Sequence, residues 1–231
     1  MFFGIDATYL YLVLPAVLFA LWAQFNVQST FSKYSKVKSH SGMTGYDSAR
    51  RILDANGLHN VGIARVAGNL TDHYNPKDNT IYLSDSVYGE TTAAAIGVAA
   101  HEAGHAVQHA VGYTPMKVRS AIIPVTQIGS NLAMPLFLLG IILSYPTLAM
   151  IGVIAFGAST LFQLVTLPVE FNASSRAMDA LRGYNLDSDD LASARKVLTA
   201  AALTYVAALA VSLANLLRLF LIASRMRGRR D

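Results

Sequence analysis

Apolar residues along this 231-residue chain are concentrated in four long blocks. Residues 7–32 carry no charge, and further uncharged blocks cover residues 121–143, 148–167 and 198–217. Each holds an apolar stretch of about 20 residues, the length that an α-helix needs to cross the hydrocarbon layer of a bilayer. We therefore predict a mainly α membrane protein with about four transmembrane helices. No Lys or Arg precedes the first block and no Ala-x-Ala site follows it, so we expect an uncleaved anchor.

Shorter patterns lie between the first two blocks. Thr44 and Asp47 resemble a capping box before a helix that ends near Gly57. Residues 61–70 and 80–84 have strand-like composition, and the turn-rich segment 72–79 separates them. We predict a small antiparallel sheet whose edge strand could pair with an extended substrate peptide. A hairpin that only covers the next helix is an equal alternative. The predicted edge consists of Thr80, Ile81, Tyr82, Leu83 and Ser84.

Residues 91–113 contain many alanines and no proline, which predicts a helix of about six turns. Gly97 and Gly104 lie inside this segment. Each glycine costs a helix roughly 1 kcal/mol relative to alanine. We therefore expect another backbone, or a substrate, to approach the helix closely at these positions.

Residues 101–105 of this helix read His-Glu-Ala-Gly-His. Residues four apart share one helix face, so His101 and His105 can bind one metal ion. Glu102 points about 100° away, which suits a general base for metal-activated water. This is the H-E-x-x-H pattern of zinc peptidases. Two structural histidines beside an unrelated glutamate are the alternative, but the helical context that the motif requires is predicted here.

A catalytic zinc ion usually has three protein ligands. Glu170 follows the third apolar block, and a hairpin of the second and third blocks would return it to the membrane face of His105. His73 is the main rival ligand. His109 lies about 12 Å along the helix axis from His101, too far to share its metal. We expect His109 to pack, to support a ligand or to lie on the surface.

Further candidates surround this predicted site. Asp179 could accept a hydrogen bond from a ligand or could be a solvated residue. An oxyanion donor would stabilise the developing charge during hydrolysis. Arg176, Tyr205 and Tyr113 could supply that donor, but each could equally pack or form an ion pair.

Composition narrows the class of protein. Charged residues make up 14% and apolar residues 53% of the chain, and there is no cysteine, which excludes disulfides. The net charge of +4 comes from basic residues that flank the apolar blocks. This pattern suits anionic lipid headgroups rather than nucleic acid. Nine basic residues lie near span ends on the membrane side of residue 101. The opposite side has the four arginines of the tail and Arg218. Because cytoplasmic loops carry an excess of Lys and Arg, this difference favours a cytoplasmic catalytic side.

Several motifs together resemble the YugP-type family of neutral zinc metallopeptidases of bacterial membranes. They are Gly-Tyr-Asp-Ser-Ala-Arg at 45–50, Leu-Thr-Asp-His-Tyr-Asn-Pro at 70–76, Ile-Tyr-Leu-Ser at 81–84, His-Glu-Ala-Gly-His-Ala-Val-Gln at 101–108 and Glu-Phe-Asn-Ala-Ser at 170–174. More distantly, the chain is similar to HtpX-type membrane proteases. That resemblance implies Glu170 as a zinc ligand. Such relatives usually carry an aspartate four residues after the glutamate, where this chain has Ser174.

The expected organisation follows from these patterns. Residues 1–32 form the anchor, 33–120 a small α+β gluzincin-like subdomain, 121–168 a transmembrane hairpin, 169–197 the segment with the glutamate ligand, and 198–231 the last span and basic tail. We expect an endopeptidase with one catalytic Zn²⁺ that acts on proteins or peptides at a bacterial cell membrane. A zinc hydrolase of another bond, such as one in lipids, and a non-proteolytic zinc-binding scaffold or chaperone are the alternatives.

Overall fold

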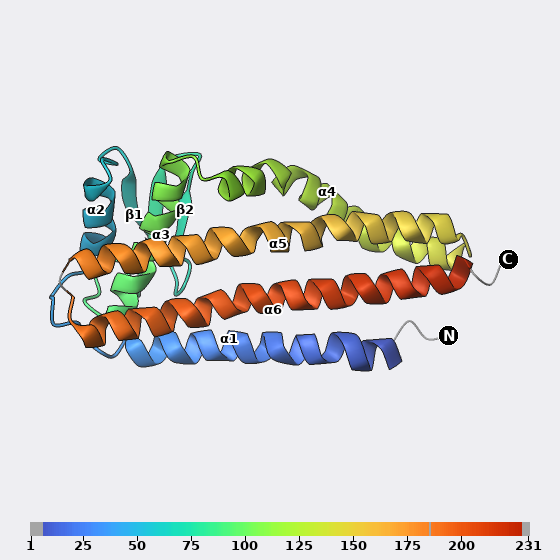
Figure 1. The fold of residues 1–231 in the computed structure, drawn as a ribbon, viewed down its shortest axis with the longest axis horizontal. Coiled ribbons are helices and arrows are strands. Elements are labelled where there is room, and N and C mark those ends of the chain that lie inside the picture. The colour runs from blue at the N-terminus through green and yellow to red at the C-terminus, as the bar shows by residue number, and fades with distance from the viewer. Residues whose placement is uncertain (1–6, 185, 228–231) are drawn as a thin grey trace. The chain divides into compact units, whose positions relative to one another are not determined.

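The computed structural model of the chain describes residues 7–184 and 186–227 (Figure 1). The chain falls into two compact units. We call residues 24–117 and 168–203 the site unit. The described residues among 1–23, 118–167 and 204–231 form the apolar unit. The long helices α1, α4, α5 and α6 each contribute residues to both units.

The predicted apolar helices are confirmed. Four helices of the described chain are long and apolar enough to cross a membrane. All extend beyond the predicted blocks, because flanking polar residues continue the helical hydrogen bonding. The first begins with a π-helical turn at Tyr9–Val13 and continues as α1, Leu14–Tyr34; the others are α4, Thr114–Ile142, α5, Pro146–Gly183, and α6, Ser188–Arg227.

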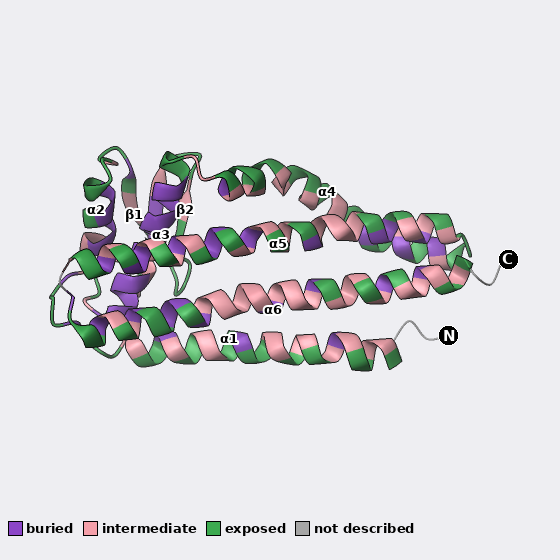
Figure 2. Ribbon diagram, in the orientation of Figure 1, coloured by how far each residue is buried: buried purple, intermediate pink, exposed green. Residues whose placement is uncertain are grey.

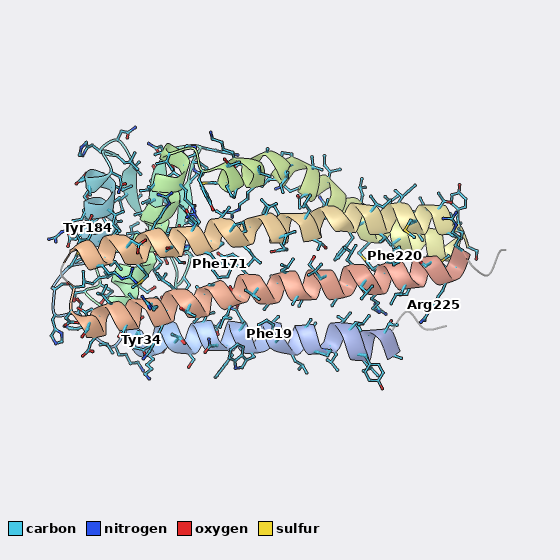
Figure 3. All side chains as sticks on the ribbon, viewed as in Figure 1. Phe19, Tyr34, Phe171, Tyr184, Phe220 and Arg225 are labelled. Atoms are coloured by element: carbon cyan, nitrogen blue, oxygen red, sulfur yellow. The ribbon has the colours of Figure 1, made fainter. Side chains whose placement is uncertain are left out.

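Small residues bring the helices of the apolar unit together. An added Cβ atom would lie 2.3 Å from the backbone nitrogen of Ala149 at Gly140, and 2.5 Å from that of Phe137 at Gly152. Thr160 and Ser212 share a hydrogen bond of 2.8 Å between α5 and α6. Such contacts are typical of helix association in lipid. Many large apolar side chains of this unit are exposed, Phe220 among them (Figure 3), as lipid-facing surfaces require.

One polar residue of α4 has a partner on the neighbouring helix. Ser130 shares a hydrogen bond with Ser159 of α5, which agrees with the interhelical bonding expected of polar residues on one face of a membrane helix. Pro124 and Pro135 lie inside α4, and each removes a backbone donor. Figure 1 shows that α4 bends along its length.

The sheet of the site unit corrects one prediction. It has three strands in the order β1-β3-β2, with β1 at Gly62–Val66, β2 at His73–Asn75 and β3 at Thr80–Ser84. Strands β1 and β3 pair in parallel, and only β2 and β3 are antiparallel. The predicted small sheet is therefore present, but residues 61–70 and 80–84 pair in parallel and not in the expected antiparallel direction, because part of the turn-rich segment forms β2 and makes the antiparallel hairpin with β3.

The predicted edge strand is wrong for the same reason. Strand β3, with Thr80, Ile81, Tyr82, Leu83 and Ser84, is the central strand and is paired on both sides. Its backbone groups are already used by β1 and β2, so it cannot accept an added peptide. The side chains of Ile81 and Leu83 are fully buried in the core of the unit.

Helix α2, Gly45–Ala55, begins and ends as its sequence predicts. The Thr44 side chain accepts a hydrogen bond from the backbone N–H of Asp47, and the Asp47 carboxylate accepts one from the backbone N–H of Thr44. After the helix, Gly57 adopts a φ of +72°, which a residue with a side chain rarely does. The buried side chains of Ala49 and Leu53 face the core.

Helix α3, Ala93–Ala110, is buried along most of its length (Figure 2). Its alanines and glycines allow neighbours to approach closely. A Cβ atom added at Gly97 would lie 3.1 Å from that of Ala194 in α6. One added at Gly104 would lie 2.6 Å from the carbonyl oxygen of Ala173 in α5. The expected close backbone approach at both glycines is thus observed, and at Gly104 it places α5 against the motif.

Candidate metal centre

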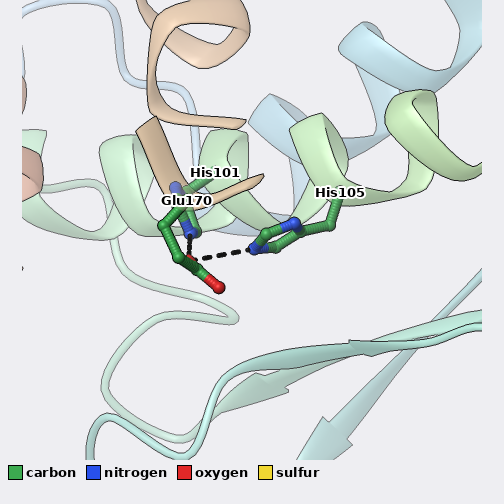
Figure 4. A group of neighbouring side chains, drawn as sticks. All are labelled: His101, His105 and Glu170. Atoms are coloured by element: carbon green, nitrogen blue, oxygen red, sulfur yellow. Dashed lines mark hydrogen bonds and ion pairs between the residues drawn. The ribbon is translucent and has the colours of Figure 1, made fainter. Parts of the chain in front are cut away.

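Two helices of the site unit bring His101, His105 and Glu170 together (Figure 4). The Glu170 Oε2 atom lies 3.3 Å from His101 Nε2 and 3.4 Å from His105 Nε2. The two imidazoles are one turn apart on α3, with ring centroids separated by 4.6 Å. The Glu170 residue is only 3% exposed. One carboxylate oxygen therefore faces two imidazole nitrogens in a largely dry setting.

This spacing fits a zinc ion. Zinc bonds to imidazole nitrogen and carboxylate oxygen are about 2.0–2.2 Å long, and structural and catalytic sites are mostly tetrahedral. Two donors of a tetrahedron with bonds of about 2.1 Å are about 3.4 Å apart. The two measured separations match this value closely. The donor set of two nitrogens and one oxygen also leaves a fourth position, as catalytic zinc sites do.

Glu102 lies beside this group and is 8% exposed. No hydrogen bond or ion pair joins its carboxylate to another residue within ranges 7–184 and 186–227. Burial lowers the pKa of His105, but its hydrogen bond to Glu170 and the charges of Glu102 and Glu170 outweigh burial and raise it. The site is thus electronegative, which favours a bound cation. A carboxylate without a protein partner is also available to accept a proton.

Asp72 adds to the negative charge near Glu102. Its carboxylate accepts hydrogen bonds from the backbone N–H and the hydroxyl of Ser84, at 2.7 and 2.9 Å. Burial, together with the charge of Glu102, raises the pKa of Asp72 above its ordinary value. Sequence reasoning missed this residue, although it lies in the motif at 70–76.

Each histidine is held through its second ring nitrogen. His101 Nδ1 lies 3.1 Å from the hydroxyl of Ser174, and His105 Nδ1 lies 3.0 Å from Oε1 of Gln108. Both contacts leave the Nε2 atoms facing Glu170. Ser174, at the position where the more distantly similar HtpX-type proteases usually have an aspartate, therefore contacts His101 through a shorter, uncharged side chain. The sequence analysis did not single out Gln108, although this residue is three positions beyond His105 and shares its helix face.

The two other histidines considered in the sequence analysis, His73 and His109, lie outside the group. His73 is exposed on β2, where its ring stacks on Tyr82 with centroids 5.0 Å apart. The structure therefore brings Glu170, and not His73, to the histidine pair. His109 Nδ1 lies 3.1 Å from the hydroxyl of Tyr74 on β2. This contact matches the packing role that was one of the expectations for His109.

The remaining candidates have separate partners. Asp179 forms an exposed ion pair with Arg182 at 2.6 Å, so of its two expected roles the solvated one is observed. Arg176 donates from Nε to Oδ1 of Asn172 at 2.8 Å. The Tyr113 hydroxyl lies 3.5 Å from the carbonyl oxygen of Pro168. Tyr205 belongs to the apolar unit and is half-buried there.

Comparison with known proteins agrees with this chemistry. A family model described as "Putative neutral zinc metallopeptidase" matches residues 9–224. The chain is 48% identical over 216 residues to a protein of Bacillus subtilis (strain 168) named "Putative membrane protease YugP". That alignment covers 93% of this chain and 96% of the relative. No solved structure matches the chain.

Proposed function

Since this chain belongs to the neutral zinc metallopeptidase family, we propose that it is a membrane-embedded endopeptidase that hydrolyses peptide bonds in proteins or peptides. The observation that carries the proposal is the Glu170 carboxylate, which lies 3.3 and 3.4 Å from the imidazoles of His101 and His105, next to Glu102. His101, His105 and Glu170 would hold the zinc cofactor. A zinc ion bound there supplies Lewis acidity, which lowers the pKa of water and polarises a carbonyl group.

Glu102 is the proposed general base. It neighbours His101 on the helix and is not committed to another protein group, so it can take the proton of the attacking water. The same carboxyl group can then deliver that proton to the leaving amine.

The cellular location is part of the proposal. The relative is named as a membrane protease and the described chain has four apolar helices, which supports a bacterial cell membrane. If each helix crosses once, the site unit lies on one side and both chain ends on the other. The excess of Lys and Arg near the span ends on the side of residue 101 supports a cytoplasmic site.

The direct test uses purified full-length protein in detergent. Zinc-loaded wild type should cleave a casein-like unfolded substrate, lose that activity on chelation and regain it with added zinc. Glu102→Gln keeps the size of the side chain but removes the base, so we expect turnover to fall about 10²- to 10⁴-fold with unchanged zinc content.

A parallel assay separates the alternatives. Cleavage of lipids but not of casein would replace the peptidase with a hydrolase of another bond. Bound zinc without turnover of either substrate would favour a scaffold. Undiminished proteolysis by Glu102→Gln would remove the proposed mechanism.

A further inference from the structure

Gln108 is a fully buried polar side chain at the metal centre to which the proposed mechanism gives no role. Its oxygen faces His105 Nδ1 at 3.0 Å. Its nitrogen faces two acceptors on α5, the carbonyl oxygen of Val169 at 2.8 Å and Oδ1 of Asn172 at 3.0 Å. The oxygen of the amide therefore contacts α3, and its nitrogen contacts α5 next to Glu170.

The chemistry of the partners fixes which way this amide points. The Nε–H of Arg176 can only donate, so the atom of Asn172 that it contacts at 2.8 Å is the oxygen. A backbone carbonyl, such as that of Val169, can only accept. The Gln108 group facing these two oxygens must then be its NH₂ group. A flipped amide would set its oxygen against both acceptors and lose two buried hydrogen bonds.

The tautomer of His105 follows from that orientation. With the Gln108 oxygen turned toward it, Nδ1 must carry a hydrogen to make the 3.0 Å contact. In the neutral imidazole only one nitrogen carries hydrogen. The lone pair is then on Nε2, the atom that lies 3.4 Å from the Glu170 carboxylate. A metal ligand needs the lone pair on that side.

We propose that Gln108 is a positioning residue that sets His105 for zinc, and that Val169, Asn172 and Arg176 fix Gln108 in turn. The inference rests on the proposed function, since it assumes that His105 binds the metal. It extends that function by linking the α3 ligand to the α5 backbone that carries Glu170. The two helices thus share one hydrogen-bond network beneath the metal centre.

Zinc affinity of the full-length protein, measured by competition with a chromophoric chelator, tests the proposal. Gln108→Met keeps the length of the side chain but cannot accept from His105, so we expect zinc to bind about 10- to 100-fold more weakly. Gln108→Glu keeps the acceptor for His105 and loses both donors to α5. We expect it to recover much of the lost zinc affinity, while its melting temperature stays as low as that of Gln108→Met.

Asn172→Ala is the matched variant for the contact with α5. It removes the two hydrogen bonds that Asn172 Oδ1 accepts from Gln108 and Arg176. The Val169 carbonyl still orients Gln108, so the loss of zinc affinity should be smaller than that of Gln108→Met. In ¹⁵N-histidine-labelled zinc-loaded protein, the hydrogen-bonded Nδ1–H signal of His105 should change in Gln108→Met and persist in Gln108→Glu.

Two results would overturn the proposal. One is wild-type zinc affinity in Gln108→Met. The other is a Gln108→Glu protein that binds zinc as weakly as Gln108→Met, because the residue would then act only as a link between helices. Either result leaves the proteolytic function standing. If the wild-type protein binds zinc tightly but shows no proteolysis, the proposed peptidase function is contradicted, whereas the proposed role of Gln108 is not.

Discussion

At the scale of single residues, a hydroxyl rather than a carboxylate faces His101 Nδ1. Ser174 makes this contact at 3.1 Å. A carboxylate accepts a stronger, charge-assisted hydrogen bond and makes the imidazole a better ligand. We therefore expect Ser174→Asp to bind zinc several-fold more tightly than wild type, and Ser174→Ala to bind it several-fold more weakly. Equal affinity in all three proteins, by chelator competition, would show that the contact does not tune the site.

Residue chemistry also explains which site residues could be predicted. The pair His101 and His105 could be predicted because helical periodicity alone places them on one face. The prediction of Glu170 also required the expected membrane hairpin, which returns the chain to the same membrane face. Gln108 could not be predicted, because an amide has no chemical signature in sequence and its role depends on where the oxygen and nitrogen atoms point. The rival His73 lies outside the group, which became evident only once its place on β2 was known.

Among the elements, α2 offers a test of pH dependence. Hydrogen bonds from the Thr44 hydroxyl and backbone N–H hold the pKa of Asp47 below its ordinary value, and burial opposes this weakly. A lowered pKa means that the stabilisation is present above the pKa of the unfolded state, near 4, and is lost as pH falls through the lower folded value. Asp47→Asn should therefore lower the melting temperature at neutral pH.

The difference between Asp47→Asn and wild type should shrink as the pH falls below 4. Thr44→Ala removes the same capping interaction from the other side and should cost about 1 kcal/mol at neutral pH. Thermal unfolding of each variant across pH values provides the measurement. A difference that stays constant down to the lowest pH would mean that the charge of Asp47 contributes nothing.

The contact between α3 and α5 gives a second prediction for the elements. Gly104→Ala would place a Cβ atom 2.6 Å from the carbonyl oxygen of Ala173, so the helices must separate near Glu170. We expect a loss of about 1–3 kcal/mol in unfolding free energy and weaker zinc binding. Gly183→Ala is the control, since a Cβ atom there meets nothing within 4 Å. Equal behaviour of the two variants would contradict the close helix contact.

The sheet shows where a sequence pattern stops being informative. Strand-like composition predicted β1 and β3 but carries no information about strand direction. Strand β2, His73–Asn75, is too short for an alternation to be recognised. Turn signals around it therefore suggested a hairpin between the wrong strands. Helix bounds were better predicted, because Thr44 and Gly57 act through local hydrogen bonds and backbone geometry.

For the whole molecule, the proposed membrane topology has one clear consequence. Four single crossings put the C-terminus opposite the site unit, so a cytoplasmic site requires an external tail. The arginines of that tail oppose this orientation; Arg225 and Arg227 are described, whereas Arg229 and Arg230 lie outside the described residues. We expect protease added to intact spheroplasts to remove a C-terminal tag. A tag cut only after permeabilisation would reverse the proposed orientation.

Four apolar blocks were enough to predict the membrane class, because crossing a bilayer demands length and apolar composition in the sequence itself. The division into two units could not be predicted in the same way. Each of α1, α4, α5 and α6 is a continuous helix that contributes to both units, so no linker marks the boundary.

The zinc content of the purified protein tests the central claim most directly. Wild type should hold about one zinc ion per chain, and His73→Ala should match it. Glu170→Ala removes the α5 donor and should bind little or no zinc, and Glu170→Gln should bind it weakly. Circular dichroism will show whether each variant is folded. Full zinc occupancy in a folded Glu170→Ala protein would contradict a metal centre shared by α3 and α5.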